Sequence, residues 1–167
     1  HMPLKENGYH SHKFVGVDID LSIPLDENDL KNDVQELMTT AASLEFINNQ
    51  EEITASVNTG DILNIPITVT SNTGHSLPSG TSFNRQVWLE IKVINDDNTI
   101  FESGIVNNNQ QLNFEDADLL VFRSVILDNN GNISNDVTDI ATGEIDNYML
   151  PAYAERRKTY EVQLPNS

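Results

Sequence analysis

The sequence contains no cysteine, which excludes disulfides, thiolate metal ligands and covalent haem attachment within this chain. Basic residues are also scarce, because nine lysines and arginines face 26 aspartates and glutamates and leave a formal net charge of −17. Nucleic acids and anionic membranes bind clusters of lysine and arginine, so this balance argues against both as partners. No apolar run approaches the roughly 20 residues of a membrane-spanning helix, and the chain shows no signal peptide.

The 167 residues suffice for one domain with a buried core, or for one domain with an appendage. Residues 1–25 are predicted to form an N-terminal arm. Its first 16 residues are polar and irregular, and the alternation of Val15, Val17, Ile19 and Leu21 then predicts a short extended piece that Pro24 ends. Asp26 is a suitable N-cap, and a helix is predicted over residues 26–42. The apolar residues of this segment recur on one helix face: Leu30, Val34, Leu37 and Ala41. Because that stripe is narrow, we expect the helix to pack on the surface of a larger domain.

From residue 43 the apolar residues alternate with a period of two, which is typical of half-buried strands. Asparagine, aspartate and glycine punctuate these runs, as expected for turns between neighbouring strands. The predicted strands cover 44–46, 53–57, 62–69, 86–95, 100–103, 119–127 and 158–164. Many short strands after a single helix predict a mainly-β fold, an immunoglobulin-like antiparallel β-sandwich over residues 43–167.

Signatures of catalysis are absent. The sequence has no Gly-x-Ser-x-Gly nucleophile elbow and no glycine-rich phosphate loop. Carboxylate pairs abound in so acidic a chain and therefore identify no acid–base site. These observations make catalysis by this domain the least favoured function.

One loop carries oxygen-bearing side chains at every second position: Asp128, Asn130, Asn132, Ser134 and Asp136. Such spacing suits a hard cation, so the loop is a candidate calcium site. It departs from an EF-hand loop because Gly131 falls at the fourth place and no glutamate closes the ring. The alternative interpretation, which turn chemistry favours, is a β-hairpin loop with an Asn-Gly turn.

Three histidines are candidate ligands. His10 and His12 lie two residues apart in the arm, where neutral imidazoles could bind one metal or two. His75 lies in a loop whose backbone is restricted by Gly74 before it and by Pro78 after it. Its ring is therefore expected to have a defined orientation, and the structural alternative is that it caps the loop by hydrogen-bonding a carbonyl.

The same loop contains residues with expected structural roles. Gly80 provides backbone freedom, and Arg85 and Trp88 are expected to stack or pair beneath the loop. Together with Gly74 and Pro78, they predict a loop that is held in one shape.

Residues 72–80 read Asn-Thr-Gly-His-Ser-Leu-Pro-Ser-Gly, and Arg-Gln-Val-Trp-Leu-Glu-Ile at 85–91 and Ile-Phe-Glu-Ser-Gly at 100–104 follow. Upstream, residues 10–17 read His-Ser-His-Lys-Phe-Val-Gly-Val. In this order the segments resemble the β-sandwich domain that follows the haem-binding part of periplasmic or extracellular multihaem c-type cytochromes. The resemblance extends over about residues 10–104 and weakens beyond them. Because no Cys-x-x-Cys-His motif is present, the chain resembles the haem-free C-terminal module of a longer cytochrome.

This resemblance implies a function in electron transfer. Its implied cofactor is haem c in the parent protein, and its implied partners are the haem-containing domain of the same chain and a redox protein. His10, His12 and His75 become candidate distal haem ligands, because such ligands often come from a histidine remote from the attachment motif. The implied location is the bacterial periplasm or the cell exterior, with the chain as an excised fragment.

The N-terminal His1-Met2 has two explanations. With Pro3 it is similar to the end of a haem-attachment site. It also matches two amino acids that a cloning vector can leave at the N-terminus. The alternative function for the whole chain is an extracellular calcium-binding β-sandwich module that binds carbohydrate or protein.

Overall fold

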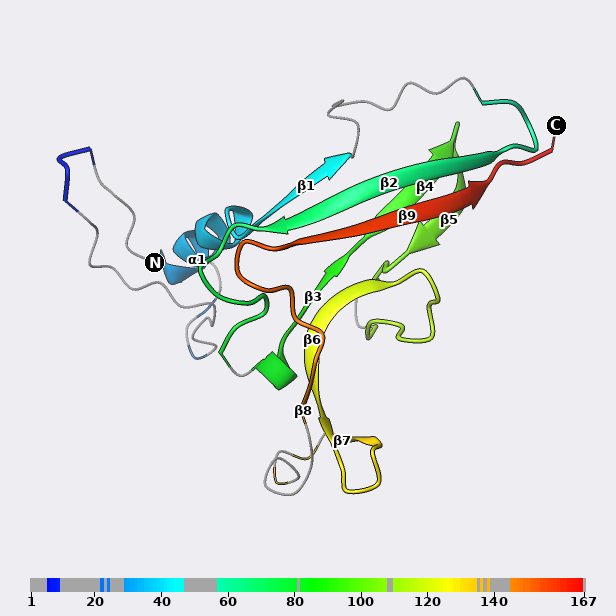
Figure 1. Ribbon diagram of the computed structural model, residues 1–167. Coiled ribbons are helices and arrows are strands. Elements are labelled where there is room, and N and C mark those ends of the chain that lie inside the picture. Colours follow the sequence, from blue (N-terminus) through cyan, green and yellow to red (C-terminus); the bar gives the residue numbers. More distant parts are fainter. Residues whose placement is uncertain are drawn as a thin grey trace. The chain divides into compact units, whose positions relative to one another are not determined.

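A computed structural model describes residues 6–9, 22, 24, 29–46, 57–80, 82–107, 110–134, 136, 138 and 145–166. Among these residues the chain is mainly β-structure, with one short helix and antiparallel strand pairs (Figure 1). The predicted mainly-β fold class is confirmed, whereas closure into an immunoglobulin-like sandwich stays a prediction. The chain divides into two compact units, residues 1–43 and residues 44–167.

The smaller unit contains the helix α1 (Asp29–Thr39). Val34, in the predicted apolar stripe, is buried, and Leu37 is half-buried. The helix ends where the hydroxyls of Thr39 and Thr40 donate to the carbonyls of Glu36 and Leu37, which supplies partners for carbonyls of its last turn. It therefore ends before the predicted limit of residue 42. The predicted N-cap and the histidine-bearing part of the arm lie outside the described residues.

The packing of this helix on the β-domain stays a prediction. In the part of the chain that the structure describes, no helix combines the length and the apolar character needed to span a membrane.

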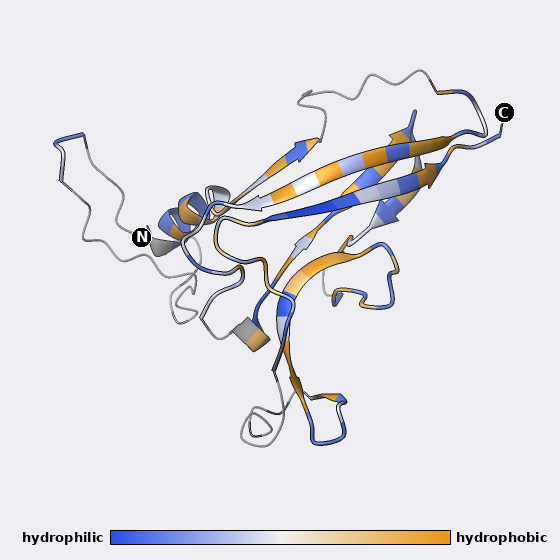
Figure 2. Cartoon of the chain, viewed as in Figure 1, coloured by the Kyte–Doolittle hydropathy of each residue, from blue (hydrophilic) through white to orange (hydrophobic). Residues whose placement is uncertain are grey.

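A three-stranded sheet contains the longest strand pair. Its order is β1 (Ala42–Phe46), β2 (Ile62–Ser71) and β9 (Glu155–Gln163). β2 and β9 run antiparallel from Ile62 opposite Gln163 to Thr70 opposite Glu155. Hydrophobic and hydrophilic residues alternate along β2 (Figure 2), as expected for a strand with one apolar face. The predicted strand over 53–57 lies almost entirely outside the described residues.

A second sheet is organised around the curved strand β6 (Leu120–Leu127). The first half of β6 pairs with β3 (Gln86–Leu89), and its second half pairs with β7 (Ile133–Ser134) and β8 (Ile145–Asn147). β6 is hydrophobic except near its middle, where Arg123 and Ser124 interrupt the apolar run (Figure 2).

The strand predicted over residues 86–95 is two strands in different sheets. β3 ends at Leu89, and β4 (Ile91–Asn95) pairs with β5 (Asn98–Ser103) instead. The two-residue turn of this hairpin contains Asp96 at φ 50°, and the pairing skips Ile100, which produces a bulge. The alternation of apolar residues continues through Glu90 because burial, and not the identity of the pairing partner, determines it.

The core joins residues from several strands. Ile67, Leu89 and Tyr160 are buried together, and Phe101 packs edge-on against Tyr160 with ring centroids 5.9 Å apart. Tyr160 is 0 % exposed, and its hydroxyl has no hydrogen-bond partner among the described residues. Burial, followed by the negative charges of Asp118 and Asp116, raises the pKa of Tyr160 to about 12.

Replacing Tyr160 with phenylalanine should therefore raise the free energy of unfolding by about 1 kcal/mol, because it removes a buried unpaired hydroxyl. The raised pKa also means that, as the pH rises, the Tyr160 hydroxyl loses its proton in the unfolded chain before it does so in the native protein. The native protein should accordingly keep its stability below pH 10 and lose part of it as the pH rises toward about 12. Tyr160→Phe should not show this part of the decrease in unfolding free energy at high pH. Urea unfolding at several pH values measures the difference.

Tyr153→Phe is the matched control, since Tyr153 is 72 % exposed. It should change the free energy of unfolding by less than about 0.5 kcal/mol. A Tyr160→Phe variant that is clearly less stable than the native protein at neutral pH would show that the hydroxyl has a stabilising partner.

Candidate functional site

The loop over residues 72–80 is anchored to the segment that precedes β9. Leu77 and Leu150 exchange two backbone hydrogen bonds, with nitrogen–oxygen distances of 2.8 and 2.9 Å. The Ser71 amide donates to the Ala154 carbonyl at 2.9 Å. Leu77 and Pro78, which are joined by a cis peptide bond, are both buried. The loop is therefore attached at its start and near its middle.

His75 lies between these two attachments and is half-buried. The Thr73 hydroxyl donates to the His75 carbonyl at 2.7 Å, and His75 Nδ1 lies 3.1 Å from the Ser76 carbonyl oxygen. A carbonyl oxygen only accepts, so Nδ1 carries the proton of the neutral ring and Nε2 carries the lone pair. This contact with Ser76 is also the carbonyl cap that the structural interpretation of His75 predicts.

The glycines of the loop lie against large side chains. Gly80 adopts φ +77°, and a Cβ atom there would lie 2.6 Å from Nη1 of Arg85. The same nitrogen donates to the Ser79 carbonyl at 2.7 Å. A Cβ atom on Gly74 would lie 3.4 Å from the hydroxyl of Tyr153. Arg85 thus bonds directly to the end of the loop, at the place where only glycine avoids both strain and overlap.

Trp88 takes part in a second network, at Gly104. The indole Nε1 of Trp88 donates to the Gly104 carbonyl at 3.0 Å. Asp116 Oδ2 accepts from the Ser103 hydroxyl at 2.8 Å and from the Gly104 amide at 2.9 Å. The Trp-Leu and Phe-Glu-Ser-Gly segments, which are separate in the sequence, therefore meet at one point.

Sequence reasoning missed Asp116. Its other oxygen, Oδ1, accepts from the Asp118 amide at 2.9 Å, which is the local turn bond that aspartate favours. Burial opposes ionisation of Asp116, but the hydrogen bonds from Gly104, Ser103 and Asp118 outweigh it and lower its pKa. The only sequence signal was this local turn pattern, because the partners at Ser103 and Gly104 are more than ten residues away.

The candidate calcium loop is a hairpin connection between β6 and β7. Asp128 Oδ1 accepts from the amides of Asn130 and Asn132 at 2.8 and 2.9 Å, and its Oδ2 accepts from the Asn132 side chain at 3.2 Å. The hydrogen bonds from Asn132 and Asn130 lower the pKa of Asp128. Gly131 adopts φ +81° at the turn. Both oxygens of Asp128 thus organise the loop itself, as the hairpin interpretation expects, and calcium binding stays a prediction.

Asp136, the last of the proposed calcium ligands, lies farther along the chain. Asp136 follows β7, and its Oδ1 accepts from the amide and the hydroxyl of Thr138 at 2.9 and 2.8 Å. Within the described residues, no group of three or more histidines, cysteines, aspartates or glutamates is placed to hold a metal ion. His10 and His12 lie outside that part of the chain, so His75 is the candidate haem ligand whose surroundings are known.

Comparison of the chain with protein-family models, with curated proteins and with solved structures gave no match. The geometry of the residues themselves therefore carries the functional argument.

Replacing Gly104 with alanine should lower the free energy of unfolding by about 3 kcal/mol. Gly104 adopts φ +70°, and a Cβ atom there would overlap the backbone carbonyl oxygen of Leu89. Gly131→Ala is the matched control, because Gly131 has a similar φ of +81° but open space around it. The unfolding free energy of Gly131→Ala, measured by urea unfolding, should fall by only about 1 kcal/mol, which is the cost of a positive φ for alanine. Equal losses in the two variants would contradict the importance of the Leu89 contact.

Asp128→Ala should lower the thermal unfolding midpoint in EDTA, because three hydrogen bonds within the loop lose their acceptor. Asp97→Ala, which removes an exposed turn carboxylate of equal charge, should have a smaller effect. The calcium hypothesis requires in addition that calcium raise the midpoint of the native chain and not that of Asp128→Ala. An unchanged midpoint for Asp128→Ala in EDTA would contradict the structural role of the carboxylate.

Proposed function

We propose that this chain is a haem-free accessory domain of a multihaem c-type cytochrome and that it serves electron transfer. It packs on the haem-bearing part of the parent protein and presents His75 as the distal ligand of one haem. The single observation that carries this proposal is the hydrogen bond between His75 Nδ1 and the Ser76 carbonyl.

Metal-binding histidines usually donate one ring N–H to a carbonyl or carboxylate and bind the metal through the other nitrogen. The His75 ring has the first part of this arrangement, because Nδ1 lies 3.1 Å from the Ser76 carbonyl oxygen, and in the proposed complex Nε2 is the nitrogen that binds the iron. The bonds of Ser71 to Ala154 and of Leu77 to Leu150 hold the loop on both sides of the ring. An anchored ligand loses little conformational entropy on binding, which favours coordination.

The donor set of this chain fits a distal role and not a covalent attachment, because a histidine is present and cysteine is absent. A haem bound in the parent protein supplies one-electron chemistry at its iron. Around that group, this chain contributes an imidazole, excludes water from one side and provides a face for a partner. Its net charge of −17 favours a partner surface rich in lysine and arginine. The expected location is the periplasm or the exterior of a bacterium.

The proposal predicts Cys-x-x-Cys-His motifs upstream of His1 in the encoding gene. In the full-length protein, His75→Met should raise the reduction potential of one haem, because methionine paired with histidine raises the potential of a haem iron. Potentiometric titration followed by visible spectroscopy measures this change.

Asn72→Met is the matched control, since Asn72 is an exposed residue of the same loop. It should leave every potential unchanged. Unchanged potentials in His75→Met would remove His75 from the ligands, and the same experiment on His10 and His12 would test the other candidates. A gene without an upstream attachment motif would overturn the proposal as a whole.

A further inference from the structure

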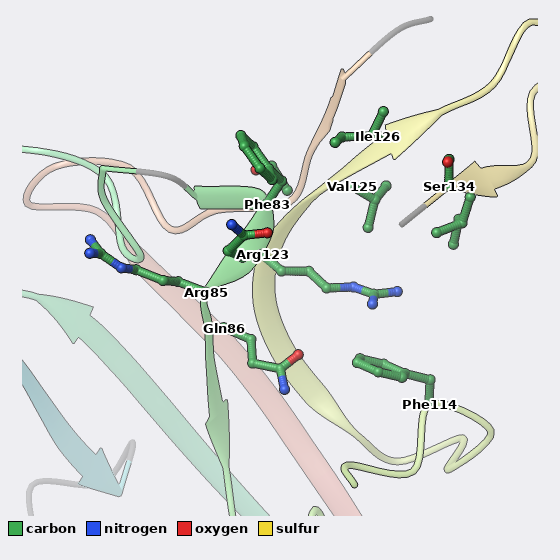
Figure 3. Close-up of a pocket in the computed structure, with 11 residues that line it drawn as sticks. Phe83, Arg85, Gln86, Phe114, Arg123, Val125, Ile126 and Ser134 are labelled. Atoms are coloured by element: carbon green, nitrogen blue, oxygen red, sulfur yellow. The ribbon is translucent and has the colours of Figure 1, made fainter. Parts of the chain in front are cut away.

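A pocket of about 260 Å³ lies beside the middle of β6, and residues 83–86, which follow the His75 loop in the sequence, form part of its lining. β3, β6, β7 and the loop before β6 all contribute to its walls (Figure 3). The residues that matter for its chemistry are Gln86, Phe114, Arg123, Val125, Ile133 and Ser134. Its volume is below the roughly 300–1,000 Å³ of pockets for drug-sized molecules, so it suits a small ligand.

The charge of this pocket is opposite to that of the chain. The net charge of the whole sequence is −17, yet the described residues that line the pocket include two arginines and no aspartate or glutamate. Arg85 points away from Arg123 (Figure 3), and its guanidinium donates to the Ser79 carbonyl. Arg123 is therefore the residue that makes the pocket cationic.

Among the described residues, Arg123 is held in place by a ring contact and not by a counter-charge. Its guanidinium carbon lies 3.9 Å from the centre of the Phe114 ring, a cation–π contact that fixes the guanidinium plane. No described carboxylate forms an ion pair with it. Burial lowers the pKa of Arg123, and the electrostatic influence of Tyr148 acts in the opposite direction. A partly desolvated cation that lacks an acidic partner costs stability and gains most from an anion.

The other walls of the pocket are apolar or neutral. Val125 is buried, and the side chains of Phe114 and Ile133 present apolar surface. Gln86, which pairs with Arg123 across the β3–β6 ladder, and Ser134 add neutral hydrogen-bonding groups. The lining is more polar than apolar, and its apolar side chains offer a limited surface beside the guanidinium for a small ligand body.

We propose that this pocket binds a small organic carboxylate with a flat apolar body, whose carboxylate pairs with the guanidinium of Arg123. The planar fork of an arginine matches the two oxygens of a carboxylate. The apolar body of the ligand contacts Phe114, Val125 and Ile133. This site requires no haem and is independent of the function proposed for His75.

Benzoate is a suitable probe, and benzamide is its neutral counterpart of the same shape. Two-dimensional ¹H–¹⁵N NMR titrations at constant ionic strength should show saturable benzoate shifts at residues of β6, β7 and the Phe114 loop. Benzamide should bind roughly tenfold more weakly or worse, because it lacks the charge that pairs with arginine. Arg123→Gln should weaken benzoate binding by a similar factor.

Arg156→Gln is the matched control, because it removes the same charge from an exposed position on β9. It should leave benzoate affinity within about twofold, since a screened surface charge contributes little. Ile133→Glu is a second test at a position that is 59 % exposed and tolerates a charge, and it should abolish benzoate binding by repulsion.

Three results would each overturn the proposal. The first is equal affinity for benzoate and benzamide, and the second is an equal effect of Arg123→Gln and Arg156→Gln in folded variants. The third is a set of benzoate shifts that excludes the pocket residues.

Discussion

Gly104 is the position on which the rest of the β-structure depends. Its φ of +70° turns the chain as β5 ends, and its α-carbon faces the carbonyl oxygen of Leu89, where the chain passes from one strand pair to another. Its amide donates to Asp116, and its carbonyl accepts from Trp88. Other residues have the same amide and carbonyl, but only glycine combines them with this φ and with the room that the Leu89 carbonyl oxygen requires. The junction connects the β4–β5 hairpin to β3 and to the loop that leads into β6.

Two different sites rest on this framework. The loop that carries His75 is attached through backbone hydrogen bonds to the segment before β9, so main-chain pairing determines where the loop lies. Arg123 owes its position to β6, whose apolar run it interrupts, and to Phe114 from the preceding loop. One proposed site contains an imidazole and the other a guanidinium cation. In a chain with net charge −17, both are chemically distinct from most of the surface.

The sequence predicted the positions of the long strands well, but it did not predict which strands pair with each other. Alternating apolar residues correctly located β2 and most of β9, because one-sided burial requires that alternation, and a nearly continuous apolar run located β6. The same pattern ran without a break through Glu90, although the chain changes sheets there. The structural importance of the loop residues was visible in their glycine and proline content. The bond from Arg85 to Ser79 was not visible, because its geometry depends on how the loop folds back.

The sequence by itself determined that no cysteine is available for thioether attachment of haem, that the chain is strongly acidic, and that strands predominate, because these follow from composition and periodicity. Only the tertiary structure decided that Asp116 accepts a hydrogen bond from Gly104, that the Tyr160 hydroxyl is buried without a hydrogen-bond partner among the described residues, and that Arg123 lies in a pocket without a described acidic neighbour. The reason is physical. Periodicity records which side chains are buried, whereas hydrogen bonds and charges across a fold depend on pairings between residues that are distant in the chain.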